Sequence, residues 1–187
     1  MIRKNSLPIL QYPNDVKNKN SGILWSRESK WLEKKTLYDD AITALKNKNY
    51  SEGIYKLSNL ISLDPTNSYL YYLRGRAYFS NNAYSLSIED FDKSLNLKSE
   101  QPKVYEARGW SKYYIKDLMG ALADFNKQIE LEPSSESYYN RGSAKSELKD
   151  EYGAIQDYTK AIELKPDYSM AFNNRGWSKY ELKKYAE

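Results

Sequence analysis

The 187-residue chain contains no cysteine and no histidine. The lack of cysteine excludes disulfides, thiolate nucleophiles and lipid attachment through a thiol, and the lack of both residues excludes Cys/His metal sites. No imidazole can serve as a general base. The sequence also has no P-loop, no GxGxxG dinucleotide fingerprint and no calcium-loop pattern. We therefore expect no catalytic, cofactor-binding or metal-binding residues, and no enzymatic activity.

Long hydrophobic runs are also missing, since no apolar stretch approaches the roughly 18 residues that a membrane span needs. The first ten residues, MIRKNSLPIL, include basic residues, but the apolar stretch is too short and too interrupted for a signal peptide. With 29% charged and 40% hydrophobic residues, the composition is typical of a soluble folded protein. We expect no membrane span and a cytoplasmic location, unless upstream residues have been removed.

Charge is distributed unevenly along the chain. The net charge is +4, but residues 1–35 hold eight Lys/Arg and three Asp/Glu, so the remainder is nearly neutral. The basic character therefore belongs to a leader over residues 1–33. A solvated tail explains this pattern, and a weak contact with an anionic surface is the alternative.

The chain does contain a recurring Arg-Gly pair. It occurs at 74–75, 108–109, 141–142 and 175–176, at spacings of 34, 33 and 34 residues. About sixteen residues after each of the first three pairs comes Asp followed by an aromatic residue, at 90–91, 124–125 and 157–158. A period near 34 residues indicates a helical repeat array.

Each period also carries two helical patterns. In the first copy, Tyr50, Ile54, Leu57 and Ile61 form a stripe at i, i+3/i+4 spacing that ends before Pro65. We predict an all-α array over 34–187, with repeats at about 34–67, 68–101, 102–134 and 135–168 and a partial repeat at 169–187. The glycines are expected inside helices, where a missing side chain lets the paired helix approach closely.

These residues resemble the tetratricopeptide repeat (TPR) family. Its pattern has a large residue, Leu-Gly, an aromatic, a small residue, an aromatic and Pro. The second copy fills these positions with Tyr71, Gly75, Tyr78, Ser87 and Phe91, and later copies add Ala121 with Phe125, and Ala154 with Tyr158 and Pro166. Arg replaces Leu before each Gly, and Lys112, Lys145, Lys179 and Ser99 are further departures from the family's pattern. The resemblance implies a right-handed superhelical α-solenoid of antiparallel helix pairs.

Residues before the first repeat do not fit the pattern. The stretch 14–22 is polar and typical of a loop, and Ser26 is predicted to cap a helix. Trp25 and Trp31 could cover the open end of the array, which such arrays require. Alternatively, residues 23–25 could occupy a groove of the array and block it.

Opposite charges recur sixteen residues apart within each repeat. The pairs are Arg74 with Asp90, Arg108 with Asp124 and Arg141 with Asp157, and the first repeat has reversed signs at Asp40 and Lys56. Pairing within a repeat keeps every contact attractive, whereas pairing Arg74 with the preceding repeat would set it against Lys56. We therefore predict salt bridges between the two helices of each repeat.

The resemblance further implies a concave groove, lined by the first helices, that binds a peptide or protein segment. Large aromatic residues at these positions are well suited to binding. The groove candidates are Tyr69, Tyr72, Arg76, Phe79, Lys103, Glu106, Trp110, Tyr113, Glu136, Tyr139, Asn140, Ser143, Met170, Asn173, Asn174, Trp177 and Tyr180. Each of them could instead pack against a neighbouring helix.

Some TPR domains hold the C-terminal carboxylate of a chaperone with Lys, Asn and Arg side chains. The matching positions here hold Tyr72, Arg76, Ala107, Glu136 and Asn140 in one set, and Glu106, Trp110, Asn140, Met170 and Asn174 in the other. We therefore do not expect a chaperone tail to bind. A scaffold that assembles through its ends is one alternative function. Stacking of single-stranded nucleic acid is another, but the nearly neutral repeats argue against it.

Overall fold

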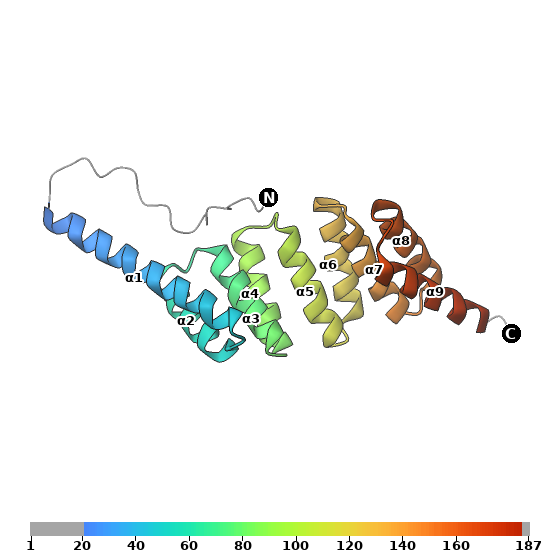
Figure 1. Ribbon diagram of the computed structural model, residues 1–187, viewed down its shortest axis with the longest axis horizontal. Coiled ribbons are helices and arrows are strands. Elements are labelled where there is room, and N and C mark those ends of the chain that lie inside the picture. Colours follow the sequence, from blue (N-terminus) through green and yellow to red (C-terminus); the bar gives the residue numbers. More distant parts are fainter. Residues whose placement is uncertain (1–20, 185–187) are drawn as a thin grey trace.

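The computed structural model describes the backbone of residues 21–184, and the side chains of residues 29–183. Within this part the chain forms nine α-helices and no strand (Figure 1). They are α1 (Ser21–Lys46), α2 (Tyr50–Leu63), α3 (Ser68–Ser80), α4 (Tyr84–Leu97), α5 (Pro102–Tyr114), α6 (Leu118–Leu131), α7 (Ser135–Glu147), α8 (Glu151–Leu164) and α9 (Ser169–Lys184). The expectation of an all-α array is confirmed.

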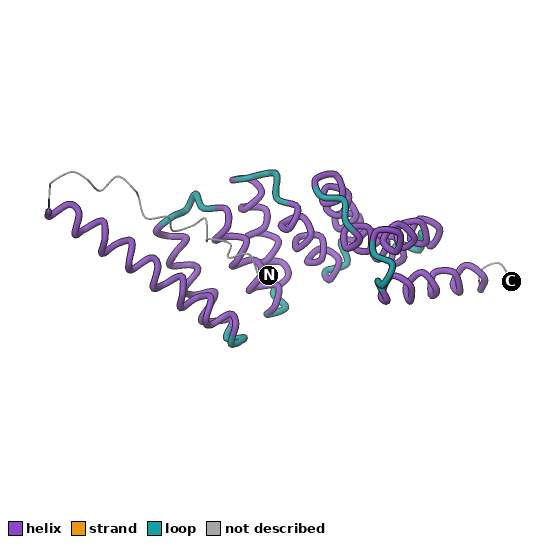
Figure 2. The backbone as a smooth tube through the Cα atoms, turned by 45° about the horizontal axis from the view of Figure 1, so that its top comes forward, coloured by secondary structure: helices purple, strands orange, loops and turns teal. Residues whose placement is uncertain are grey.

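The helices form a row in which each one packs against the next. Figure 2 shows short loops that join neighbouring helices on alternating sides of the row, so consecutive helices run antiparallel. The helices α3, α5, α7 and α9 each begin a repeat period, and we call them first helices. Successive first helices approach one another more closely than the described second helices α2, α4, α6 and α8 do, so the first helices line the inner face.

The turn between the two helices of a pair is built in the same way four times. Lys48, Asn82, Lys116 and Lys149 each have a positive φ of 59° or 67°, the left-handed conformation that commonly ends a helix. The second helices then begin at a capping side chain in three of the four turns. Asp117, for example, accepts a hydrogen bond from the backbone N–H of the residue three positions later.

In the second, third and fourth repeats, an aromatic ring of the second helix packs against the glycine of the Arg-Gly pair. A Cβ atom added to Gly75 would lie 2.6 Å from Cε1 of Phe91 on the paired helix. The corresponding distance is 2.7 Å for Gly109 and Phe125. Both rings are fully buried. The close approach expected from sequence is therefore made by one side chain that occupies the space of the missing methyl group.

Helix α1, at the start of the row, is longer than the sequence predicts. α1 has 26 residues, nearly twice the 14 of α2, and it extends beyond α2 at one end of the row (Figure 1). The predicted helix start at Ser26 is wrong, because Ser26 lies inside α1, five residues after its beginning. The side chains of residues 21–28, including Trp25, lie outside the described residues. Two alternatives therefore stay predictions: that Trp25 and Trp31 cover the end of the array, and that residues 23–25 block its groove.

Candidate functional site

Salt bridges fix which face each first helix presents. Nε and Nη2 of Arg74 donate to the two oxygens of Asp90 at 2.8 and 2.7 Å. Arg108 and Arg141 bind Asp124 and Asp157 in the same two-pronged manner, at 2.6 to 2.9 Å. The predicted pairs within each repeat are confirmed, and so is the reversed pair Lys56–Asp40 at 3.1 Å. Two parallel hydrogen bonds hold each guanidinium in one orientation.

The same arginines also reach the preceding repeat, which the sequence reasoning missed. Nη1 of Arg74 donates to Ser58 at 3.0 Å, and Nη1 of Arg141 donates to Asn126 at 3.0 Å. Arg108 makes the equivalent contact with Asp92. The repeat spacing contained this signal, because each acceptor lies fifteen or sixteen residues before its arginine. Each arginine thus joins three helices and fixes the angle between adjacent repeats.

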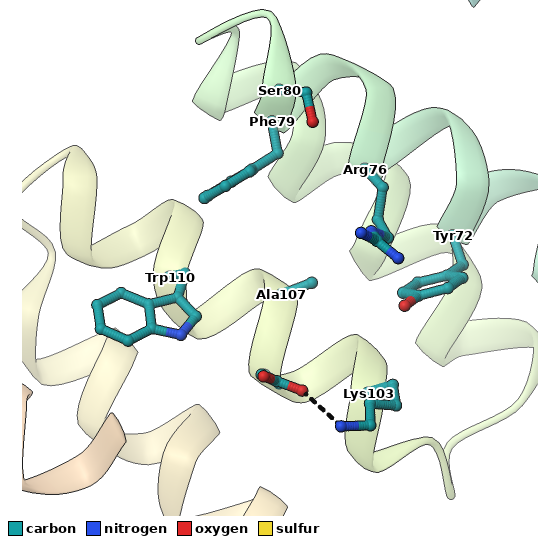
Figure 3. A pocket seen from close by; sticks show the side chains of 8 residues that line it. Tyr72, Arg76, Phe79, Ser80, Lys103, Ala107 and Trp110 are labelled. Atoms are coloured by element: carbon teal, nitrogen blue, oxygen red, sulfur yellow. Dashed lines mark hydrogen bonds and ion pairs between the residues drawn. The ribbon is translucent and has the colours of Figure 1, made fainter. Parts of the chain in front are cut away.

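A cavity of about 470 Å³ lies on the inner face between α3 and α5. Figure 3 shows its lining, with Tyr72, Arg76, Phe79 and Ser80 on one helix opposite Lys103, Ala107 and Trp110 on the other, and Glu106 completes it. Six of these eight residues are groove candidates from the sequence. The structure therefore brings the candidates of the second and third repeats together in one site.

The cavity continues toward the first repeat. A second hollow of about 280 Å³ shares Arg76 and Ser80 with the first, and it is also lined by Ile42, Leu45, Lys46, Tyr50, Leu73 and Ala77. We call the two hollows together the inner groove. Sequence reasoning named no candidate in the first repeat. Yet Ile42 and Leu45 lie 34 residues before Arg76 and Phe79, so the repeat spacing alone would have found them.

Charges in the inner groove are only partly compensated. Nζ of Lys103 donates to Glu106 at 3.1 Å, and this hydrogen bond raises the pKa of Lys103 (Figure 3). Arg76 is exposed, and its guanidinium lies 5.9 Å from the ring centre of Tyr72 without a carboxylate partner among the described residues. The groove therefore offers Arg76 as an accessible cation beside aromatic rings, and Lys46 is a second exposed cation toward the first repeat.

A cluster of aromatic rings supports the far end of the cavity. The ring of Phe79 lies edge-on to Tyr84 and Tyr114, with centroids 5.5 and 5.7 Å apart, while Tyr84 and Tyr114 stack at 4.9 Å. Trp110 packs edge-on against the buried ring of Phe125 at 5.4 Å. Tyr84 and Tyr114 were not among the sequence candidates. Their contacts hold the rings of the groove in fixed positions, so binding there costs little conformational entropy.

Two other candidates flank this site. Tyr69 packs against Tyr72 with ring centroids 5.8 Å apart. Tyr113 packs edge-on against Trp110 at 5.3 Å, and its hydroxyl donates to Glu147 of α7 at 3.4 Å. Burial and the nearby Glu147 carboxylate raise the pKa of Tyr113. Both side chains are partly buried and serve helix packing as well as the inner face.

The candidates of the fourth repeat have mostly structural positions. Asn140 is only 4% exposed and its Nδ2 donates to Gln128, so it is not on the surface. The ring of Tyr139 packs against Tyr158 and Tyr168, and its hydroxyl accepts a hydrogen bond from Asn174. Ser143 donates to the backbone oxygen of Tyr139, while Glu136 is exposed. A hydrogen bond from Ser135 lowers the pKa of Glu136.

The fifth-repeat candidates lie on α9, outside the cavity. Met170, Asn173, Trp177 and Tyr180 are all exposed, and Trp177 packs against Tyr180 with ring centroids 5.6 Å apart. Asn174 is tied to Tyr139. The seventeen candidates therefore do not form one continuous surface with the same properties. They form a groove at α3 and α5, a packed region at α7, and an exposed aromatic pair at α9.

Comparison with known proteins identifies the repeat. Family models described as tetratricopeptide repeat match residues 68–101 and 135–168. RNA polymerase II-associated protein 3 from Xenopus tropicalis is 30% identical over 111 residues, which cover 59% of this chain and 16% of that protein. Hsp70-Hsp90 organizing protein from Triticum aestivum is 32% identical over 87 residues, which cover 46% of this chain and 15% of that protein. The chain therefore spans less than one fifth of either relative.

Solved structures share the fold. MamA (residues 41 to the end) from Desulfovibrio magneticus RS-1 superposes with a TM-score of 0.77 at 19% identity, covering 80% of this chain and 85% of that one. The first TPR of Spaghetti (RPAP3), solved bound to the HSP90 peptide SRMEEVD, gives a TM-score of 0.60 at 24% identity, covering 62% and 93%. No helix within residues 21–184 is long and apolar enough to cross a membrane.

Proposed function

Because the chain is built from tetratricopeptide repeats, we propose that it is a protein-interaction module whose inner groove binds a segment of another protein. The observation that carries this proposal is the cavity between α3 and α5. Aromatic rings line this cavity, and Arg76 also lines it without a carboxylate partner among the described residues. A catalytic site for a small-molecule substrate has no comparable support among the described residues. We therefore propose that the groove binds a protein segment rather than catalyses a reaction.

The lining defines the chemistry of the bound segment. Phe79 and Trp110 present apolar ring surface, and Ile42, Leu45 and Leu73 extend this surface toward the first repeat. Burying an apolar side chain there is worth about 25 cal/mol per Å² of area removed from water. An Asp or Glu on the same segment would pair with Arg76. We therefore propose a segment in which an apolar or aromatic residue lies next to an acidic one, bound with micromolar affinity, about −8 kcal/mol.

The relatives support a protein ligand. One is named for association with RNA polymerase II and another for organizing Hsp70 and Hsp90, while a structural neighbour is solved with an HSP90 peptide. These comparisons give no support to the expectation that a chaperone tail does not bind. That expectation depends on the residues alone: Glu136 would repel a terminal carboxylate, and Asn140 is buried against Gln128.

A displayed peptide library tests the proposal. Peptides selected on the 187-residue protein should combine an apolar or aromatic residue with an adjacent Asp or Glu. Arg76→Glu should weaken their binding at least about tenfold, roughly 1.4 kcal/mol. Lys93→Glu makes the same charge change on an exposed part of α4 and should leave affinity unchanged. Trp110 and Tyr139 are poorer positions for this test, since both pack against buried rings.

Equal weakening by the two charge reversals would show a long-range electrostatic effect and contradict a groove at α3 and α5. Binding of the peptide SRMEEVD is measured in a separate experiment. We expect no saturable binding at micromolar concentration; saturable binding would overturn the expectation about chaperone tails and leave the interaction module intact. The cytoplasmic location expected from the sequence stays a prediction that microscopy of the tagged protein would test.

A further inference from the structure

The two hollows of the inner groove differ in size and in the side chains that line them. The hollow between α3 and α5, here called the aromatic hollow, measures about 470 Å³ and has three rings in its lining, Tyr72, Phe79 and Trp110. Figure 3 shows Phe79 and Trp110 at one end of it, and Arg76 with Lys103 at the other. An aromatic side chain of a bound segment would therefore find rings to pack against, in the edge-to-face or offset arrangements that such rings favour.

The hollow toward the first repeat, here called the aliphatic hollow, is smaller, at about 280 Å³. Four aliphatic side chains line it, Ile42, Leu45, Leu73 and Ala77. Tyr50 also contributes to the lining. The smaller volume and the aliphatic walls favour a side chain such as Leu or Ile over a large ring.

Arg76 and Ser80 line both hollows, so they form the boundary between them. Both side chains are exposed. The guanidinium of Arg76 lies beside the ring of Tyr72 and has no carboxylate partner within residues 29–183. Lys46 adds a second exposed cation to the aliphatic hollow, whose described lining holds no carboxylate. A carboxylate that binds Arg76 would therefore lie between the two hollows.

The spacing of the helices sets the distance between the two hollows. The aliphatic hollow lies between α1 and α3, and the aromatic hollow lies between α3 and α5. α3 contacts α5, and helices in contact have axes about 8–10 Å apart. Because the repeat gives α1 and α3 a similar spacing, the centres of the hollows are about 10 Å apart. An extended chain rises about 3.3 Å per residue, so two side chains three residues apart span this distance.

We propose that the inner groove recognises an extended segment through two anchors of different shape with a carboxylate between them. An aromatic side chain enters the aromatic hollow, and an aliphatic side chain three residues away enters the aliphatic hollow. An Asp or Glu at one of the two intervening positions binds Arg76, whereas Lys or Arg there would be repelled by Arg76 and Lys46. This proposal rests on the proposed function and adds to it the type, number and spacing of the anchors.

Synthetic peptides test the two anchors against the 187-residue protein by isothermal titration calorimetry. One contains Trp-Asp-Ser-Leu between flanking Gly and Ser residues, with acetylated and amidated ends that remove the terminal charges. Another has the four residues in reverse order, because the hollows do not fix the chain direction. Two more replace Trp or Leu by Ala in the order that binds more tightly. We expect micromolar binding of the two-anchor peptide, and at least about tenfold weaker binding without either anchor, since burying one large apolar side chain contributes that much.

Variants of the protein assign each anchor to its hollow. Ile42→Ala shortens a side chain of the aliphatic hollow, so it should weaken the two-anchor peptide and leave the peptide without Leu unaffected. Phe79→Leu changes the aromatic hollow, so it should weaken the two-anchor peptide and leave the peptide without Trp unaffected. Partial unfolding would weaken every peptide alike, so the match between variant and anchor separates recognition from a structural effect. Met119→Ala, at an exposed position on α6, is the control and should leave all affinities unchanged.

Three results would overturn the two anchors and leave the proposed function standing, provided that library-selected peptides still depend on Arg76. The first is a single-anchor peptide that binds as tightly as the two-anchor peptides. The second is an equal effect of Ile42→Ala and Phe79→Leu on every peptide. The third is the absence of saturable binding by both two-anchor peptides at millimolar concentration. If the library-selected peptides fail to bind as well, the proposed function itself is wrong.

Discussion

Replacing Gly142 by alanine should leave the array less stable than replacing Gly176 by alanine does. Both glycines occupy the same position of the repeat and lie inside a helix. At Gly142 the added Cβ would lie 2.8 Å from Cε1 and 3.0 Å from Cδ1 of Tyr158. That ring is only 1% exposed and has little room to move.

The magnitude follows from two effects. Alanine is favoured over glycine inside a helix by about 1 kcal/mol, and this gain applies at both positions. Forcing a methyl group into a packed core costs about 1–3 kcal/mol, and this cost applies only at Gly142. The helix effect cancels in the comparison. The free energies of unfolding of the two variants should therefore differ by about 1–3 kcal/mol, with Gly176→Ala the more stable.

Urea unfolding followed by circular dichroism measures the difference. Repeat arrays can unfold in parts, so hydrogen exchange of the α7 and α8 amides should accompany it and show faster exchange in Gly142→Ala alone. Unfolding free energies that agree within about 0.5 kcal/mol, the usual range for changes without a specific mechanism, would refute the close contact between glycine and ring.

Three further predictions concern charge and titration. Asp157→Asn leaves two cations without their buried carboxylate; it should cost about 3 kcal/mol, the low end for a buried pair because both cations keep some solvent contact, and a loss below about 0.5 kcal/mol in urea unfolding would contradict this. Burial raises the pKa of Tyr168 from 10.0 to about 12. The unfolded chain therefore releases this proton first, and stability should fall between pH 10 and 12 less steeply in Tyr168→Phe than in the wild type. The hydrogen bond from Lys116 lowers the pKa of Glu147. Its contribution is therefore present above the unfolded pKa and is lost as pH falls through the lower folded value, and Lys116→Ala should remove that part of the acid dependence in thermal melts.

The recurring residue spacing predicted the array of helix pairs, because each repeat makes the same contacts between its two helices. The Arg108–Asp124 pair could be inferred from charge signs alone, and the reversed signs at Asp40 and Lys56 supported it. The contact of Arg74 with Ser58 was missed although its spacing recurs, because a neutral acceptor adds no charge pattern to that spacing. The length of α1 was missed for a similar reason, since residues before the repeat carry no periodic signal.

The groove was predictable only in part. Position within the repeat placed Arg76 and Trp110 among the groove candidates, and both line the cavity. It could not show that Asn140 turns inward to Gln128. A polar residue at a predicted surface position can equally point inward and hydrogen-bond a buried polar group. Nor could it show that Tyr84 and Tyr114 stack, since these two rings come from different repeats and meet only when α4 and α5 pack together.

The location of the bound segment tests the central claim most directly. A peptide selected on the wild-type protein should be titrated into the isotope-labelled protein while backbone chemical shifts are recorded. Binding in the inner groove predicts perturbations concentrated on the facing sides of α3 and α5, around Arg76 and Trp110. Perturbations concentrated on the second helices α4 and α6, with α3 and α5 unchanged, would contradict it.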